Sequence, residues 1–291
     1  MHPKSDPTGP ARFRVYFQER FPLHQHAPLV AAFSFCAVSY AAHLRRVDWP
    51  TWSAFAVAFP VCLLFFLQLR IADEFKDKEE DARWRPYRAV PRGLVSLKEL
   101  GWMFAIAALV QFILILSLDP RLLWILLGAW SYLIAMSVEF GARDWLKARP
   151  IVYLLSHMLI MPIVDFTATA CDWVPANQHP PAGLGFFLVT SFLNGLVIEL
   201  GRKIRLPKDE EAGVETYSAL WGRDRALKIW RGVLCACAVC ATASLSMVNA
   251  PLFSFLFISA AAGISACAGK RVETVSGIWT LILYLTLGLS P

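Results

Sequence analysis

Long apolar runs constrain this chain more than any other feature of its sequence. Nine stretches with few charges have about the 17–25 residues that an α-helix needs to cross a bilayer. They are residues 27–44, 51–69, 100–118, 122–139, 150–171, 182–200, 226–248, 251–268 and 273–290. Continuous apolar runs lack the alternation of barrel strands, and within lipid a helix satisfies its own backbone amides. The sequence predicts an all-α integral membrane protein with nine transmembrane helices.

The amino-acid composition also indicates a protein that is embedded in a lipid bilayer. The chain is 57% hydrophobic and 17% charged, whereas soluble proteins are about 45–50% apolar and about 25% charged. A soluble enzyme, a disulfide-stapled secreted domain and a disordered chain are excluded. The net charge of +6 does not indicate a nucleic-acid partner, because in a membrane protein the position of charge matters more than its sum.

The basic residues predict which side each loop occupies. With the helices placed as above, all of the 28 Lys and Arg fall on one side except Arg45, Arg46 and Arg121. The positive-inside rule makes that side cytoplasmic. We therefore expect a cytoplasmic N-terminal segment over 1–26 and a single nine-helix membrane domain over 27–291, in the plasma membrane of a bacterium. The loops 70–99 and 201–231 are expected to be cytoplasmic and to bind substrate.

The first of these loops carries an acidic repeat. Asp73, Asp77 and Asp81 are four residues apart, so on a continuing helix they drift by only about 40° per step and share one face. Stacked carboxylates repel unless a cation lies among them, and Mg²⁺ prefers carboxylate and phosphate oxygens. The alternative is a solvated helix end of mixed charge, since Lys76 and Lys78 are interleaved.

Basic residues lie close to both acidic stretches. The first stretch is followed by Arg83, Arg85, Arg88 and Arg92, and the second sets Glu199 and Asp209 among Arg202, Lys203 and Arg205. Carboxylates that hold a metal beside guanidinium groups suit a diphosphate. Each stretch follows the second helix of a four-helix set, within 27–139 and within 150–268. The chain is therefore predicted to form two four-helix halves plus a ninth helix, with both loops at one mouth of a central cavity.

These motifs resemble those of the UbiA superfamily of intramembrane prenyltransferases. Residues 73–81 follow the family's Asn/Asp-Asp-x-x-Asp-x-x-x-Asp motif, with Asp for Asn and Glu for Asp, and residues 88–93 are similar to its Arg-Pro-x-Pro-x-Gly segment. The spacing of Gly213, Thr216 and Gly222 resembles the close of its second motif. The second motif departs from the family, because basic residues stand where two or three aspartates are usual.

The resemblance implies a Mg²⁺-dependent enzyme that ionises a prenyl diphosphate and passes the prenyl group to an acceptor of unknown identity, which we expect to be aromatic or lipophilic. The implied metal ligands are Asp73, Glu74, Asp77, Asp81, Glu199 and Asp209. The implied diphosphate ligands are Arg85, Arg88, Arg92, Lys147, Arg202 and Lys203. The family's Tyr and Lys after the fourth helix are absent here. We expect Glu139 to pair with Arg143 one turn on, which leaves Lys147 or Arg149 as substitutes; the alternative is that these residues are simple interface anchors.

Two ionisable residues fall inside the fifth apolar run, where such groups are functional candidates. His157 and Asp165 are eight residues apart and would share a helix face. Asp165 is predicted to join Asp73, Asp77 and Asp81 as a catalytic residue that assists acceptor deprotonation. The alternative is a structural hydrogen bond from Asp165 to Thr167 or Thr169.

Two other functions remain open at this stage. A terpene cyclase of the same superfamily would use the same diphosphate chemistry without an acceptor. A membrane transporter could also have internal repeats and a charged mouth. Transporters usually keep ionisable groups at the bilayer midplane, however, and here the charges gather at the cytoplasmic rim.

Overall fold

The computed structural model describes residues 8–250, 260, 261, 263–265 and 271–290, and within them it contains helices and no strand. In chain order the helices are α1 (Ala11–Arg20), α2 (Leu23–Leu44), α3 (Trp52–Lys76), α4 (Lys78–Trp84), α5 (Leu97–Leu118), α6 (Leu122–Ser137), η1 (Glu139–Gly141), α7 (Arg143–Lys147), α8 (Pro150–Met158), α9 (Ile160–Trp173), α10 (Leu184–Arg202), η2 (Pro207–Asp209), α11 (Tyr217–Trp221), α12 (Arg223–Met247) and α14 (Val272–Leu289).

Seven of these apolar segments are long enough to cross a membrane, with α8 and α9 together forming one span. The shorter apolar helix α6 matches another predicted segment. The all-helical membrane architecture is therefore confirmed, and these eight segments lie within a few residues of their predicted bounds, except that α3 continues beyond the predicted end at 69 to Lys76. The predicted helix over 251–268 lies outside the described residues except at 260, 261 and 263–265, so the total of nine stays a prediction.

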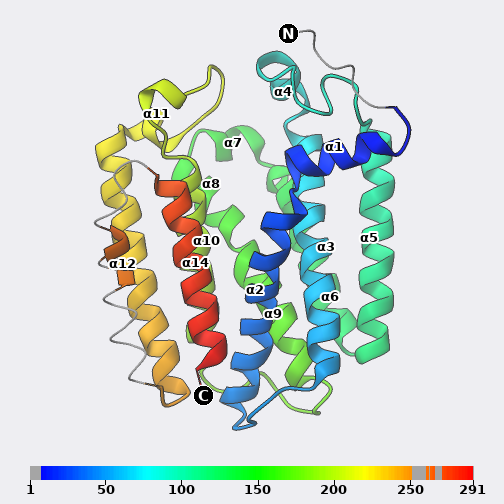
Figure 1. The fold of residues 1–291 in the computed structure, drawn as a ribbon, viewed down its shortest axis with the longest axis vertical. Coiled ribbons are helices and arrows are strands. Elements are labelled where there is room, and N and C mark those ends of the chain that lie inside the picture. Colours follow the sequence, from blue (N-terminus) through cyan, green and yellow to red (C-terminus); the bar gives the residue numbers. More distant parts are fainter. Residues whose placement is uncertain (1–7, 251–259, 262, 266–270, 291) are drawn as a thin grey trace.

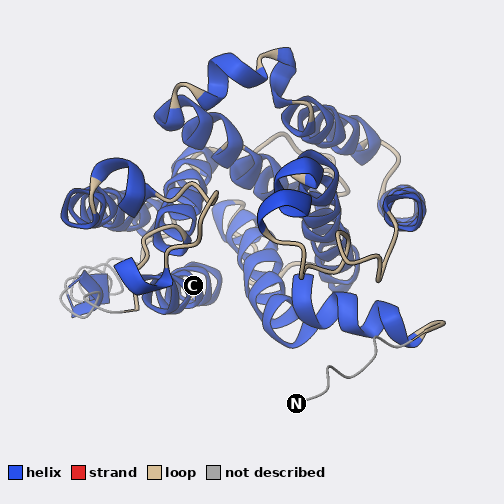
Figure 2. Cartoon of the chain, turned by 90° about the horizontal axis from the view of Figure 1, so that it is seen from above, coloured by secondary structure: helices blue, strands red, loops and turns tan. Residues whose placement is uncertain are grey.

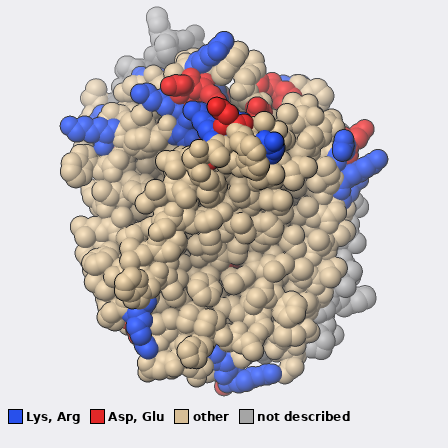
Figure 3. Space-filling model, turned by 180° about the vertical axis from the view of Figure 1, so that it is seen from behind, with Lys and Arg blue, Asp and Glu red and all other residues tan. Residues whose placement is uncertain are grey.

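The long helices run along the longest axis of the molecule, and the two termini lie at opposite ends (Figure 1). Viewed from above, these helices stand side by side and are seen nearly end-on (Figure 2). The end that carries α1, α4, α7 and α11 is called the charged end below. Figure 3 shows why: Lys, Arg, Asp and Glu gather there, a wide uncharged band follows, and a few basic side chains lie at the opposite end. This banding is what a bilayer around the middle requires.

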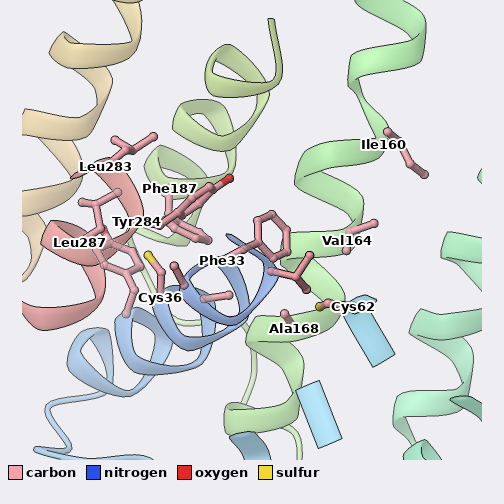
Figure 4. Close-up of a cluster of buried hydrophobic side chains, with 14 of the residues drawn as sticks. Phe33, Cys36, Cys62, Ile160, Val164, Ala168, Phe187, Leu283, Tyr284 and Leu287 are labelled. Atoms are coloured by element: carbon pink, nitrogen blue, oxygen red, sulfur yellow. The ribbon is translucent and has the colours of Figure 1, made fainter. Parts of the chain in front are cut away.

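The centre of the bundle is a close-packed apolar core. Phe33 of α2, Phe187 of α10 and Tyr284 of α14 converge there with the small side chains Cys62 and Ala168 (Figure 4). The rings of Phe33 and Tyr284 meet edge to face, with centroids 5.1 Å apart. Small residues let helix backbones approach closely, which drives packing where lipid offers no hydrophobic gain.

The helical span over residues 150–173 is broken at Leu159, between α8 and α9. Pro162 is the third residue of α9, within its first turn. It has no backbone N–H, and its ring crowds the carbonyl four residues earlier, so a helix that continued from α8 would lose a hydrogen bond there. The break separates His157 from Asp165, which the sequence placed on one continuous helix face.

Helix α1 lies across the charged end, beside the ends of α3 and α5 (Figure 1). Its Tyr16 is fully buried in a second apolar cluster with Ile71, Leu94 and Leu100. Burial raises the pKa of Tyr16, so the phenol stays neutral. This cluster fixes the end of α3, the helix that carries the first acidic motif.

Candidate active site

A cavity of about 680 Å³ opens at the charged end, with side chains from α3, α8, α10 and α11 and from the loops around them. Both charged stretches of the sequence line it. Its acidic side chains are Asp73, Asp77, Glu80, Glu139, Glu199 and Glu215, and its basic ones are Arg20, Arg70, Lys76, Arg85, Arg88, Arg143, Lys147, Arg202, Lys203 and Arg205. The excess of basic groups makes the cavity suited to an anion.

Asp73 and Asp77 form the acidic wall. Asp73 makes only long contacts, 3.5 Å to Arg70 Nη1 and 3.9 Å to Lys76 Nζ. Among the described cavity residues, Asp77 and the exposed Glu215 are the carboxylates without an ion pair. Burial first, and the charge of Asp73 second, raise the pKa of Asp77. An unpaired carboxylate beside a second one is a site that a cation would stabilise.

The other acidic residues of the first motif face elsewhere. Asp81 is buried and accepts ion pairs from Arg85 and Arg88, each at 2.7 Å, and Glu74 is buried against Arg20. Neither carboxylate lines the cavity. The continuous helix expected over 73–81 does not form, because α3 ends at Lys76 and α4 begins at Lys78. The three carboxylates are therefore not presented together.

The wall of the cavity that α10 forms is basic, because its one carboxylate is paired with basic side chains. Glu199 lies 2.6 Å from Arg202 and 3.0 Å from Lys203, so its charge is neutralised within one turn of α10. Asp209, which sequence reasoning added to the metal ligands, lies in η2 and does not line the cavity. Arg202 and Lys203 both do, on the side of the cavity formed by α10.

Three more predicted diphosphate ligands, Arg85, Arg88 and Lys147, also line the cavity. Lys147 of α7 pairs with Glu80, and this hydrogen bond lowers the pKa of Glu80. Arg92 does not line the cavity and instead holds Glu19 of α1, at 2.8 Å.

The two charged loops are joined directly at the cavity mouth. Tyr87 donates a hydrogen bond to Glu211 across 3.2 Å. Trp84 covers Gly213, where an added Cβ would lie 2.3 Å from the indole. The φ of +73° at this position also requires glycine.

A polar network that sequence reasoning missed lies along the cavity wall. Lys76 donates to the Tyr153 hydroxyl at 2.8 Å, Tyr153 donates to Glu139 at 3.2 Å, and His157 Nε2 lies 3.1 Å from Glu139. Although burial raises the pKa of Glu139, its contacts with His157 and Lys76 outweigh burial and lower that pKa overall. The spacing of Tyr153 and His157, one turn apart, was the available sequence signal.

The expected pair of Glu139 with Arg143 is wrong. The chain leaves α6 at Val138, and Glu139 and Phe140 both adopt a left-handed backbone with φ of 53°. Residues 139 and 143 are therefore not one turn apart on a helix, and Arg143 lies near Glu80 instead. Non-glycine residues in this conformation cost roughly 1–3 kcal/mol each and persist only where their surroundings hold them.

Asp165 lies in the helix core rather than on the cavity. It is fully buried and accepts a hydrogen bond from Tyr284 at 3.3 Å. The alternative partners considered from sequence do not bind it, since Thr167 donates to Ile163 and Thr169 to Phe166.

The cavity ends on an apolar floor. Met158, Ile160 and Met161 line it beside Gly195 of α10. A Cβ at Gly195 would lie 2.8 Å from Met161 Cγ, so the absence of a side chain at Gly195 lets the two methionines close the floor.

The residues present fit a magnesium ion that is completed by substrate. No group of three His, Cys, Asp or Glu side chains in the described part of the chain could hold a metal by itself. Mg²⁺, however, commonly binds one or two carboxylates and takes its remaining ligands from water and phosphate. Asp73 and Asp77 on the cavity wall supply such a pair.

The fold and the site together define a class of protein, a helical membrane bundle with a charged cavity at one end. The sequence places the chain within this class: residues 29–277 match the UbiA prenyltransferase family, and the protein belongs to that family. The resemblance drawn from the motifs is thus confirmed. A search among curated proteins finds no match to this sequence.

Solved structures share the fold. The apo UbiA homologue from Aeropyrum pernix K1 superposes with a TM-score of 0.68 at 15% identity, over 87% of this chain and 94% of that one. A digeranylgeranylglyceryl phosphate synthase gives 0.60 at 14% identity, over 96% and 98%. The UbiA homologue from Archaeoglobus fulgidus bound to DMAPP and Mg²⁺ gives 0.59 at 12% identity, over 91% and 96%.

Proposed function

We propose that this protein is a Mg²⁺-dependent intramembrane prenyltransferase that ionises a prenyl diphosphate and transfers the prenyl group to an aromatic or lipophilic acceptor. One observation carries the proposal: the unpaired carboxylate Asp77 and the basic pair Arg202 and Lys203 line one cavity above an apolar floor. Family membership and relatives solved with a prenyl diphosphate and Mg²⁺ support it.

The basic side chains would bind the diphosphate. Arg85, Arg88, Lys147, Arg202 and Lys203 line the cavity, and each already holds a carboxylate partner. These ion pairs fix the positions of the guanidinium and ammonium groups before substrate arrives. Charge-assisted hydrogen bonds to phosphate oxygens are stronger than neutral ones, so pre-positioned donors favour capture of the diphosphate.

Asp73 and Asp77 would hold the metal. A bound Mg²⁺ would supply positive charge to offset the negative charge of the leaving diphosphate. Glu199 is neutralised by its own bases, and Glu74, Asp81 and Asp209 lie off the cavity lining, so we leave these four out of the proposed metal site.

The floor and the walls would guide the cation. Met158, Ile160 and Met161 would exclude water from the apolar part of the cavity, which would limit premature capture of the carbocation by water. Phe66 on the wall offers an aromatic ring to positive charge. We place the charged end, with both loops, on the cytoplasmic side because of the basic asymmetry.

The test is product analysis. Purified protein is incubated with Mg²⁺ and prenyl diphosphates of several chain lengths, with and without a panel of aromatic acceptors, and products are identified by mass; chelation of Mg²⁺ is the control. A prenylated acceptor supports the transferase. A hydrocarbon or terpene alcohol released equally without acceptor would assign a cyclase, and no release of diphosphate in any mixture would overturn the proposal. A transporter is not retained, because the family assignment favours prenyl chemistry.

A further inference from the structure

A carboxylate and an imidazole meet on the cavity wall, and Lys76 lies between this carboxylate and Asp73 of the acidic wall. Glu139 Oε2 lies 3.1 Å from His157 Nε2, and the two residues are 3% and 6% exposed. Both line the cavity, and His157 is followed directly by Met158 of the apolar floor. The pair therefore lies on the same cavity as the floor that would receive the prenyl chain.

The two nitrogens of His157 face different groups. His157 Nδ1 lies 2.9 Å from the carbonyl oxygen of Tyr153, which can only accept. Nε2 faces the Glu139 carboxylate, which when ionised also only accepts. A neutral imidazole donates from one nitrogen alone, so the tautomer of His157 decides whether its proton faces the Tyr153 carbonyl or the Glu139 carboxylate. Paired histidine and carboxylate side chains are groups that carry out acid–base chemistry.

Apart from Asp73 and Asp77, which we assign to the metal, the other carboxylates of the cavity either pair with basic side chains alone or are exposed. Glu80 is paired with Lys147, Glu199 with Arg202 and Lys203, and Glu215 is exposed. Asp165, which sequence reasoning made the deprotonating group, is packed against Tyr284 outside the cavity lining. Glu139 is thus the buried cavity carboxylate that contacts an imidazole.

The backbone supports a functional placement for Glu139. Its left-handed conformation turns the side chain out of the register of α6, and contacts from Tyr153, Lys76 and His157 then hold the carboxylate. Strained residues held by a polar network cluster at reactive sites. A carbocation is a very strong acid. The position of the group that deprotonates it therefore matters more than the basicity of that group.

We propose that Glu139 is the general base that takes the proton released in the reaction, and that His157 is its positioning residue. The inference rests on the proposed function. The C–O bond between the prenyl carbon and diphosphate breaks, and its electron pair leaves with diphosphate. The prenyl carbon then bonds to the acceptor atom, and the hydrogen on that atom passes as a proton to the Glu139 carboxylate. Water receives the proton as product departs.

The proton-loss step can be measured apart from ionisation. Geranyl diphosphate with heavy oxygen at the bridging position scrambles that label whenever the C–O bond breaks and re-forms, without any deprotonation. The second readout is a ratio of products. The numerator is the sum of prenylated acceptor and elimination hydrocarbon, which both require a base, and the denominator is the prenyl alcohol that forms with water. Wild type, Glu139→Gln and His157→Asn are compared, with phenolic acceptors and without.

We expect Glu139→Gln to keep label scrambling while the product ratio falls by about 10²–10⁴-fold, the usual contribution of a general base. His157→Asn should lower the ratio less and leave scrambling intact. Asp119→Asn, which removes an arginine-paired carboxylate from a partly exposed position outside the cavity lining, should change neither readout. If Glu139→Gln does not fold, Glu139→Asp replaces it, with the ratio reduced and scrambling retained.

Two outcomes overturn the inference. An unchanged product ratio in folded Glu139→Gln would show that another group takes the proton, and a parallel loss of scrambling and ratio would assign Glu139 to ionisation instead. Both leave the proposed function standing. Wild-type protein that neither scrambles the label nor releases diphosphate would overturn the proposed function, and the inference with it.

Discussion

The indole of Trp84 lies directly over Gly213, so closely that an added Cβ would stand 2.3 Å from Cδ2. These residues belong to two loops more than a hundred positions apart in the sequence. Their contact closes one side of the cavity and joins the arginine-rich first loop to the second.

Gly213→Ala should separate the two loops. The substitution places a Cβ in the Trp84 ring at a φ of +73°, and the left-handed backbone alone costs roughly 1–2 kcal/mol. We expect a raised KM for the prenyl diphosphate and faster proteolysis within 205–216. Gly232→Ala, in α12 with no neighbour near its Cβ position, is the matched control. Unchanged proteolysis in Gly213→Ala would show that the contact does not order the loop.

Asp77→Asn should stabilise the metal-free protein and abolish its response to Mg²⁺. Like charges four residues apart cost about 0.2–0.5 kcal/mol per pair, and burial and Asp73 both raise the pKa of Asp77. Thermal unfolding of wild type should shift upward with Mg²⁺ and a diphosphate, whereas Asp77→Asn should begin higher and stay flat. A Mg²⁺-dependent shift in the variant equal to that of wild type would exclude Asp77 as a ligand.

Glu74→Gln should separate stability from metal binding. Glu74 is buried against Arg20 of α1, and breaking a buried ion pair costs up to roughly 3–5 kcal/mol. We expect a lower unfolding temperature with an unchanged Mg²⁺ concentration for half-maximal activity. A shifted Mg²⁺ requirement at wild-type stability would instead restore Glu74 to the metal site, as the motif alone suggests.

Met161→Ala should lengthen the prenyl chain that the cavity accepts. Met161 packs against Gly195 to close the apolar floor, so truncation deepens the space for the tail. The ratio of kcat/KM for farnesyl over geranyl diphosphate should rise roughly tenfold, the scale of a changed apolar contact. Met103→Ala, on α5 away from the cavity lining, should leave the ratio unchanged. The same chain-length profile in both variants would place the tail elsewhere.

The stabilising effect of Glu139 should depend on pH in a defined direction. Burial raises the pKa of Glu139, but the His157 and Lys76 contacts lower it overall. A depressed carboxyl pKa contributes stability that is complete above the ordinary value, about 4.3, and is lost as pH falls through the folded value. The difference in unfolding temperature between wild type and Glu139→Gln should be largest near neutral pH and shrink below about pH 4. A constant difference at every pH would mean that the carboxylate charge is not involved.

The eight apolar segments that the structure describes were predictable because lipid acts on each segment separately. A run such as 51–69 must be helical whatever its neighbours are, since its backbone amides have no other partners in hydrocarbon. The motif at 73–81 could also be recognised from the sequence alone. What it could not show was that α3 ends at Lys76, which turns Asp77 to the cavity and Asp81 to Arg85 and Arg88.

The sequence by itself determined the class of the protein: a helical membrane bundle of the UbiA family, with an acidic and a basic stretch at one end. Only the tertiary structure decided which charged side chains line the cavity and which are held in ion pairs away from it. Glu74 pairs with Arg20, 54 residues away, and Glu139 with His157 rather than with Arg143. Ion pairs between helices depend on how those helices pack and where their backbones break, and no local pattern encodes either.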